Sequence, residues 1–195
     1  MKSLKIYMVR HGRSRGNREG VYIGWTDTPL DPEGAEQIRA VKANLPERFD
    51  AVYVSPLLRT RQSADILVGP GGYSLCEGIK ETHFGTWEGM NAARIAAEYP
   101  QDWEAWQRDW IDTVPPGGES ARQAYDRIRA ALADILAAHE QGQVLLVTHG
   151  GVIRLLLCQL LEVEMEKSWH YRLDPGGMAL VEMVDGYGVL RRLGD

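Results

Sequence analysis

The sequence predicts an α/β fold, in which a mostly parallel sheet lies between two layers of helices in a three-layer α/β/α arrangement. Short β-branched runs alternate along the chain with stretches of helical periodicity, as in parallel βα units. Hydrophobic residues make up 44% of the 195 residues, which is enough to bury a full core in a single domain, 1–195. The two cysteines, Cys76 and Cys158, have no paired spacing, so neither a disulfide framework nor a zinc site is expected.

The regular elements are expected in a definite order. The first strand covers residues 4–10, and the run Asp31-Pro32-Glu33 then supplies an N-cap, a proline at the first helical position and an acidic first turn. The helix that begins there carries Ile38, Val41 and Leu45 on one face. The other expected elements are a strand near 51–54, a helix over about 57–67, a helix from Ser120 to about His139, a strand over 143–148 followed by a helix, and a closing hairpin or edge strands over 178–184 and 187–193.

Residues 84–115 differ from the rest of the chain because they are aromatic and acidic, and they are expected to form a small helical lid inserted into the domain. Trp103, Trp106 and Trp110 have the i, i+3, i+7 spacing of one helix face. Such a stripe is either the packed core of the insertion or a wall that stacks on a substrate. The sequence leaves both interpretations open.

Charge and hydropathy exclude several classes of partner. The formal net charge of −5 argues against nucleic-acid binding as the main function, since such domains are usually basic. The first strand is too short and too polar for a signal sequence, and no later apolar run approaches 18 residues, so no membrane span is expected. The unpaired cysteines are predicted to be buried thiols in a cytoplasmic protein. The apolar segment 178–190 is a candidate edge for pairing in a homodimer.

Basic side chains follow three of the predicted strands. Arg10 and His11 come directly after the first strand, Arg59 lies just beyond the second, and His149 follows the strand at 143–148. In an open α/β sheet, ligands bind beyond the carboxyl ends of the strands, so these four side chains are expected to meet. Guanidinium forks and imidazoles are donors suited to phosphate oxygens, and His149 is expected to supply a third cationic donor. The sequence therefore predicts a phosphate pocket.

A fifth residue, Glu81, lies in the run Glu81-Thr82-His83-Phe84-Gly85-Thr86-Trp87-Glu88-Gly89. Together with the four basic residues, it resembles the histidine phosphatase superfamily, the fold shared by phosphoglycerate mutases and many small phosphatases, over nearly the whole chain. The resemblance implies a phosphohistidine intermediate at His11. It also implies that Glu81 protonates the leaving oxygen and then deprotonates the attacking water. No metal or other cofactor is expected, and the partner is a small phosphorylated metabolite.

Other residues around this set carry weaker predictions. Glu88 is a rival carboxylate, but it is expected to cap or pair structurally. His83 is either a substrate contact or a packed or solvent-facing ring. The resemblance further implies that Ser14 and Asn17 contact the phosphate or line its entrance, and that Gly24 is a loop glycine nearby. Gly150 begins a predicted helix and is expected to offer its backbone N–H to the anion.

Three functions remain to be compared. Around Glu81 the chain also resembles the mutase branch, but Thr82, Phe84 and Ala92 stand where that branch has arginine, tyrosine and lysine. The run Pro116-Gly117-Gly118-Glu119-Ser120 resembles the phosphatase branch, with likeness to both α-ribazole 5′-phosphate phosphatases and broad-specificity phosphatases. A metal-independent phosphomonoesterase is therefore the expected function. Phosphoglycerate mutase is the alternative, and a non-catalytic phospho-ligand-binding scaffold is the second alternative, because fold does not fix function.

Overall fold

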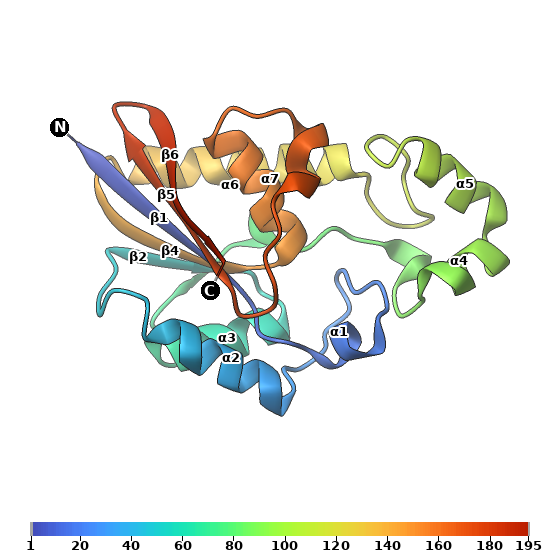
Figure 1. The fold of residues 1–195 in the computed structure, drawn as a ribbon, viewed down its shortest axis with the longest axis horizontal. Helices are drawn as coiled ribbons and strands as arrows, with labels where there is room; N and C mark the ends of the chain where they lie inside the picture. Colours follow the sequence, from blue (N-terminus) through green and yellow to red (C-terminus); the bar gives the residue numbers. More distant parts are fainter. Residues whose placement is uncertain (1, 195) are drawn as a thin grey trace.

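The computed structural model describes residues 2–194, and in that part of the chain six strands form one sheet (Figure 1). The strands are β1 (Ser3–Arg10), β2 (Ala51–Val54), β3 (Ser74–Leu75), β4 (Gly142–Thr148), β5 (Met178–Val184) and β6 (Tyr187–Gly194). Their order is β3-β2-β4-β1-β5-β6, in which the first four run parallel and β5 and β6 add an antiparallel hairpin. The predicted α/β class and mostly parallel sheet are confirmed.

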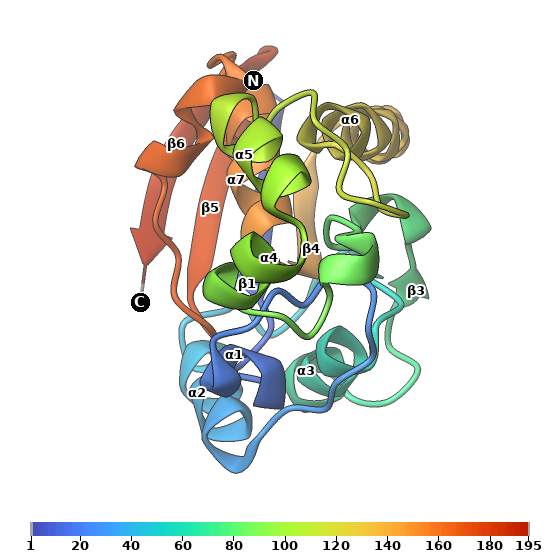
Figure 2. The same cartoon turned by 90° about the vertical axis from the view of Figure 1, so that its right-hand side faces the viewer.

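Helices cover both faces of the sheet, as Figures 1 and 2 show from two sides. One face carries α2 (Pro32–Lys42) and α3 (Leu58–Val68), and the other carries α6 (Ala121–Ala138) and α7 (Gly150–Leu160). Side chains of β4 alternate between the two resulting cores: Leu146 packs with residues of α6 and α7, whereas Leu145 packs with residues of α2 and α3. Because both faces are covered, most residues of the central strands β1 and β4 are buried and apolar.

The start of α2 follows the sequence prediction, but its end does not. The carboxylate of Asp31 accepts the backbone N–H of Gly34 at 2.7 Å, and Pro32 occupies the first turn. The helix ends at Lys42, so Leu45 lies beyond it rather than on its face. Leu45 still packs against the same core as Ile38 and Val41. Its apolar side chain therefore continued the helical spacing in the sequence, although the helix itself had ended.

Residues 84–115 project beyond the end of the sheet, at the right of Figure 1 and at the front of Figure 2. They contain the 3-10 turn η2 (Gly85–Trp87) and the helices α4 (Ala92–Glu98) and α5 (Pro100–Arg108). Trp103 and Trp106 of α5 stack on each other with centroids 5.3 Å apart, and they contact the fully buried ring of Trp87 at 5.7 and 6.1 Å. The three rings thus form the packed core of the insertion, and Tyr22 contacts both Trp103 and Trp106 from outside it.

Trp110 lies outside α5, although its spacing suggested one continuous helix. The carboxylate of Asp109 accepts the backbone N–H groups of Ile111 and Asp112, each at 3.1 Å. Such a local turn competes with continuation of a helix. Trp110 instead contacts Trp169 edge to face, with centroids 5.8 Å apart.

Four short elements were not predicted. They are α1 (Arg15–Glu19), β3 and the 3-10 turns η1 (Glu77–Ile79) and η3 (Met165–His170). Each has two to six residues, which is too few for hydrophobic periodicity to show.

The predictions made from composition have different outcomes. Cys158 is buried, and burial raises the pKa of its thiol to about 11, whereas Cys76 is only half-buried and so departs from the prediction. Within residues 2–194, none of the helices is both long enough and apolar enough to cross a membrane. The homodimer through segment 178–190 stays a prediction, and β6 is the edge strand that it would use.

The loop after β1 is pressed against the first turn of α2. A Cβ atom on Gly12 would lie 2.1 Å from the carbonyl oxygen of Gly34, and a Cβ atom on Gly34 would lie 2.0 Å from that of Arg13. Both distances are far inside van der Waals contact, so only glycine permits this approach. The guanidinium of Arg13 also donates to the carboxylate of Asp31 at 2.7 Å, which ties the loop to the N-cap of α2.

Candidate active site

Two histidines lie side by side at the carboxyl ends of neighbouring strands. Arg10 of β1 pairs with Thr148 of β4, so the residues that follow them, His11 and His149, meet. Their ring centroids are 5.2 Å apart in an edge-to-face arrangement, and both residues are buried. The sheet thus brings together two residues that are 138 positions apart in the chain.

The environment of His11 fixes both its tautomer and its charge. Its Nδ1 lies 2.7 Å from the carbonyl oxygen of Gly12. Since a carbonyl oxygen only accepts, Nδ1 carries the proton and Nε2 keeps its lone pair. Burial lowers the pKa of His11 well below its usual value, and the charges of Arg59 and Arg10 lower it further. The ring is therefore neutral at pH 7, which is the form that can attack phosphorus.

His149 does not have the positive charge that the sequence suggested. Burial, together with the charge of Arg59, lowers the pKa of His149 well below its usual value, so its ring is neutral at pH 7. Its Nε2 lies 2.7 Å from the hydroxyl oxygen of Ser55, while its Nδ1 is buried without a hydrogen-bond partner among the described residues. If Ser55 donates to Nε2, Nδ1 carries the proton and is free to donate to an anion. A neutral donor then takes the place of the expected cation.

Arg10 and Arg59 are held by backbone carbonyls rather than by carboxylates. Arg10 donates to Leu173 at 2.6 Å, and Arg59, which is 1% exposed, donates to Gly24 at 2.8 Å and to Thr26 at 3.0 Å. Burial lowers the pKa of both guanidiniums, but their usual pKa is so high that both stay charged at neutral pH. The Nε of Arg10 is buried and makes no hydrogen bond within residues 2–194. A buried and a partly buried cation with an unused donor form a site for a polyvalent anion.

Glu81 and Arg10 meet at the first turn of α7. A Cβ atom on Gly150 would lie 3.0 Å from Nε of Arg10, and a Cβ atom on Gly151 would lie 2.6 Å from Oε1 of Glu81. The carboxylate and the guanidinium therefore lie against the same piece of backbone. All five predicted catalytic residues converge at this end of the sheet. Across the described part of the chain, no group of three or more His, Cys, Asp and Glu side chains is arranged to hold a metal ion.

Replacing Gly151 with alanine is expected to lower kcat about 10- to 100-fold, because the new methyl group would displace the carboxylate of Glu81. Steady-state kinetics with a phosphomonoester would measure this loss. Inhibition by inorganic phosphate should change little, since Arg10, His11 and Arg59 are not displaced. Alanine is also a better helix former than glycine, so a lower melting temperature would indicate a general disturbance and contradict the explanation.

The predicted phosphate-contacting residues Ser14 and Asn17 form a helix cap in the structure. The backbone N–H and the hydroxyl of Ser14 both donate to the side-chain oxygen of Asn17, at 3.1 and 2.9 Å, and this pair begins α1. Their contact with phosphate stays a prediction. Gly24 supplies its carbonyl oxygen to Arg59, and a Cβ atom on Gly24 would lie 2.6 Å from Oε1 of Glu88. Its role in the structure is thus to hold an arginine and to leave room for a carboxylate.

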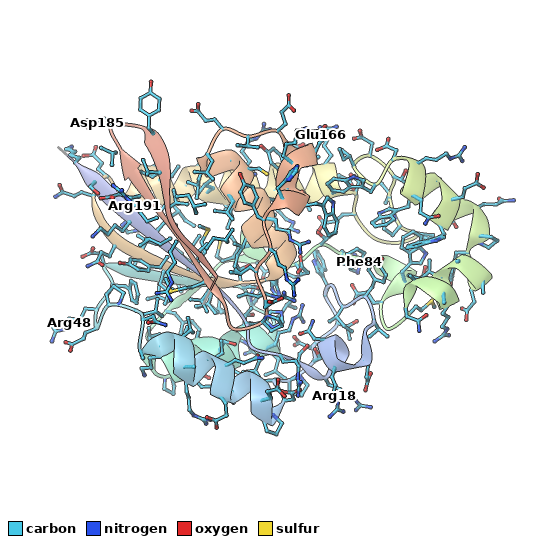
Figure 3. All side chains as sticks on the ribbon, viewed as in Figure 1. Arg18, Arg48, Phe84, Glu166, Asp185 and Arg191 are labelled. Carbon is cyan, nitrogen blue, oxygen red and sulfur yellow. The ribbon has the colours of Figure 1, made fainter. Side chains whose placement is uncertain are left out.

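A cavity of about 230 Å³ opens beside Glu81. Its polar lining includes Glu119 and Arg154, but most of the lining is apolar. Five aromatic side chains contribute to it: Tyr22, Phe84, Trp106, Trp110 and Trp169. Figure 3 shows Phe84 at the start of the projecting segment 84–115, at its end nearest the sheet. Trp106 packs within the insertion and also lines this cavity. The packing interpretation therefore applies to it, and its contact with a substrate stays a prediction.

Arg154 is a site residue that the sequence analysis missed. It lines the cavity together with Glu81, its Nε donates to the carbonyl oxygen of Tyr171 at 3.0 Å, and its guanidinium carbon lies 4.6 Å from the centre of the Trp169 ring. Arg154 follows Gly150 by four residues, which places both on the same side of α7. That i, i+4 spacing was the signal that could have found it.

Comparison with known proteins agrees with this architecture. Residues 6–195 match the profile of the histidine phosphatase superfamily (branch 1). Adenosylcobalamin/α-ribazole phosphatase of Escherichia coli is 28% identical over 193 residues, 97% of this chain and 95% of that protein. Phosphoserine phosphatase 1 of Hydrogenobacter thermophilus is also 28% identical over 193 residues, 97% of this chain and 92% of that protein. The crystal structure of α-ribazole phosphatase from Shigella flexneri has a TM-score of 0.92 at 27% identity, covering 98% of this chain and 96% of that one. The chain belongs to the histidine phosphatase superfamily.

Proposed function

We propose that the protein is a phosphomonoesterase that transfers the phosphoryl group of a small metabolite to His11 and then to water. The observation that carries the proposal is the neutral imidazole of His11, whose Nε2 has a free lone pair beside the guanidiniums of Arg10 and Arg59. The relatives named α-ribazole phosphatase and phosphoserine phosphatase support a small phosphorylated substrate. The proposed chemistry needs only side chains of this site.

In the first step, Nε2 of His11 forms a bond to phosphorus while the bond from phosphorus to the leaving oxygen breaks. Arg10, Arg59 and the Nδ1–H of His149 donate hydrogen bonds to the three equatorial oxygens, where negative charge is spread in the transition state. Glu81 begins this step protonated and gives its proton to the leaving oxygen, so that the product departs as a neutral alcohol.

In the second step, a water oxygen attacks phosphorus and Glu81, now a carboxylate, takes the proton of that water. The P–N bond breaks, and its electron pair returns to Nε2 of His11. Inorganic phosphate is released, and Glu81 is again protonated for the next cycle. Both roles of Glu81 fit its place beside the first turn of α7, between the phosphate-binding residues and the cavity.

The cavity beside Glu81 favours an aromatic leaving group. Its aromatic wall offers stacking and edge contacts to a ring of the substrate. Arg154, whose guanidinium lies over the ring of Trp169, adds a cation to this wall. Thr82 and Phe84, which also line the cavity, provide no charged donor for a substrate carboxylate, so Arg154 is the only cation that the described residues contribute to the lining. Each missing charge-assisted bond forfeits about 1.5–3 kcal/mol. We therefore rank α-ribazole 5′-phosphate and aryl phosphates above phosphoserine and 3-phosphoglycerate.

Phosphate release from a panel of monoesters in excess EDTA tests this proposal. The panel contains α-ribazole 5′-phosphate, p-nitrophenyl phosphate, sugar phosphates, nucleotides, phosphoserine and 3-phosphoglycerate, with a parallel assay for phosphoglycerate interconversion. We expect kcat/KM for the esters with aromatic groups to exceed that for phosphoserine and 3-phosphoglycerate by at least about 10-fold, one lost charge-assisted contact. Interconversion without phosphate release would show a mutase and contradict the proposal, and phosphate binding without turnover would support the scaffold.

A further inference from the structure

Glu88 is a nearly buried carboxylate that backbone donors surround. Its side chain is 9% exposed. Its Oε1 accepts the N–H groups of Trp25 at 2.8 Å and Phe84 at 3.3 Å, and its Oε2 accepts the N–H of Thr26 at 2.6 Å and also the Thr26 hydroxyl. Among the described residues, no lysine or arginine forms an ion pair with it. Nε2 of His83 lies 3.7 Å from it, and the charge of Glu88 also acts on the guanidinium of Arg59. A buried carboxylate is costly unless its lone pairs are filled. Three of these four bonds fix the loop 24–27, and the fourth ties the carboxylate to the backbone of Phe84.

The loop 24–27 in turn holds Arg59 and the helix that carries it. The carbonyl oxygens of Gly24 and Thr26 accept the guanidinium of Arg59. The carboxylate of Asp27 accepts the N–H of Leu58 at 2.7 Å, at the start of α3. Both the backbone before Arg59 and the charged end of its side chain are thus bonded to one four-residue loop.

The same loop also contacts the backbone of Glu81. The indole N–H of Trp25 donates to the carbonyl oxygen of Glu81 at 2.8 Å, and the Trp25 ring stacks on His83 with centroids 4.5 Å apart. The missing side chain at Gly24 allows the Glu88 carboxylate to come this close. Two residues of the proposed machinery, on separate elements, therefore depend on one loop that Glu88 secures.

We propose that Glu88 is a positioning residue of the active site: through the loop 24–27 it sets where the guanidinium of Arg59 and the backbone of Glu81 lie relative to His11. This inference rests on the proposed function and concerns the same site. Glu88 acts through the loop and not on the reacting atoms. Because a misplacement of about 1 Å can cost about 100-fold in rate, a loosened loop should slow phosphoryl transfer.

The substitution Glu88→Gln tests this role with almost no change in side-chain size. Each carboxylate oxygen of Glu88 accepts two hydrogen bonds, and in glutamine an NH₂ group replaces one of these oxygens. That group is a donor and faces two donors, so about half of the four bonds would be lost. We expect kcat for p-nitrophenyl phosphate to fall about 10- to 100-fold while the circular dichroism spectrum is unchanged. The matched control is Glu98→Gln on α4, which removes only an exposed pair with Arg94 and should leave kcat unchanged.

The pH profile separates positioning from a general loosening of the fold. His11 is surrounded by Arg59, Arg10 and His149, and the charge of Arg59 is one cause of its lowered pKa. If Glu88→Gln lets Arg59 move away, the pKa of His11 rises, so the nucleophile becomes protonated at a higher pH. The acid limb of kcat/KM should then move to higher pH. A substitution that only destabilised the fold would leave this limb in place.

A double-mutant cycle on phosphate binding gives the decisive comparison. With inorganic phosphate as the titrant in calorimetry, Glu88→Gln should weaken binding in the wild-type background but not further in an Arg59→Ala background. Equal losses in both backgrounds would overturn the proposal, as would unchanged activity of Glu88→Gln in an active enzyme. If the wild-type protein hydrolyses no phosphomonoester and the binding losses are still non-additive, the positioning role stands and the proposed function fails.

Discussion

Replacing His11 with alanine is expected to abolish turnover, with kcat falling by at least about 10³-fold. The reason is chemical, because Nε2 of His11 is the nucleophile and its lone pair is kept free by the bond from Nδ1 to the carbonyl of Gly12. Brief reaction with a ³²P-labelled monoester, quenched at alkaline pH where a P–N bond survives, should label the wild-type protein and leave His11→Ala unlabelled. Phosphate release measured in parallel gives the loss in rate.

The control for this experiment is His170→Ala, which removes an exposed imidazole from η3. Its labelling and turnover should equal those of the wild-type protein. Undiminished hydrolysis by His11→Ala would show that any activity comes from another group, and it would remove the basis of the proposed mechanism.

Replacing Glu81 with glutamine is expected to slow hydrolysis of alkyl phosphates about 10²- to 10⁴-fold, because the leaving alkoxide then departs without a proton. The first step should be much less affected with p-nitrophenyl phosphate, since p-nitrophenolate is a good leaving group that needs no proton. The second step should slow for every substrate, because no carboxylate deprotonates the attacking water. Stopped-flow measurement should therefore show a burst of p-nitrophenolate followed by slow turnover.

The matched substitution Glu104→Gln changes an exposed residue of α5 and should leave both phases unchanged. If Glu81→Gln slowed p-nitrophenolate release and alkyl phosphate hydrolysis equally and produced no burst, another group would have to be the proton donor. Glu119 lines the same cavity, but its carboxylate is already paired with Arg127 at 2.6 Å.

The sequence was informative about the site because the sheet itself brings the site together. Arg10 ends one strand, His11 follows it, and His149 follows the neighbouring strand. Because these two strands pair in parallel, the residues at their carboxyl ends lie together. The capped start of α2 was equally predictable, since Asp31 and Pro32 act through their own backbone. Local chemistry and the alternation of strands with helices are both visible in a sequence, whereas the order of the strands in the sheet comes from the structure.

Other parts of the site depend on contacts between segments that periodicity does not relate. The loop 24–27, which accepts the guanidinium of Arg59, is bonded in turn to Glu88, 62 residues beyond Thr26. The charge of His149 depends on burial and on the guanidinium of Arg59, so the sequence alone suggested a cation where the structure has a neutral ring. Trp110 left its predicted helix because the Asp109 side chain formed a competing turn.

The contact between Gly12 and Gly34 has a consequence for how this chain can diverge. Neither glycine supplies an atom to the proposed chemistry, yet a methyl group at either position would push backbone into backbone and move the loop that carries the nucleophile. We therefore expect selection on activity to act on Gly34 as well as on residues that touch phosphate. Among related sequences, a position kept for close backbone packing and a position kept for contact with phosphate would look equally invariant. The structure distinguishes them, because each of these glycines faces a backbone carbonyl oxygen and not the phosphate site.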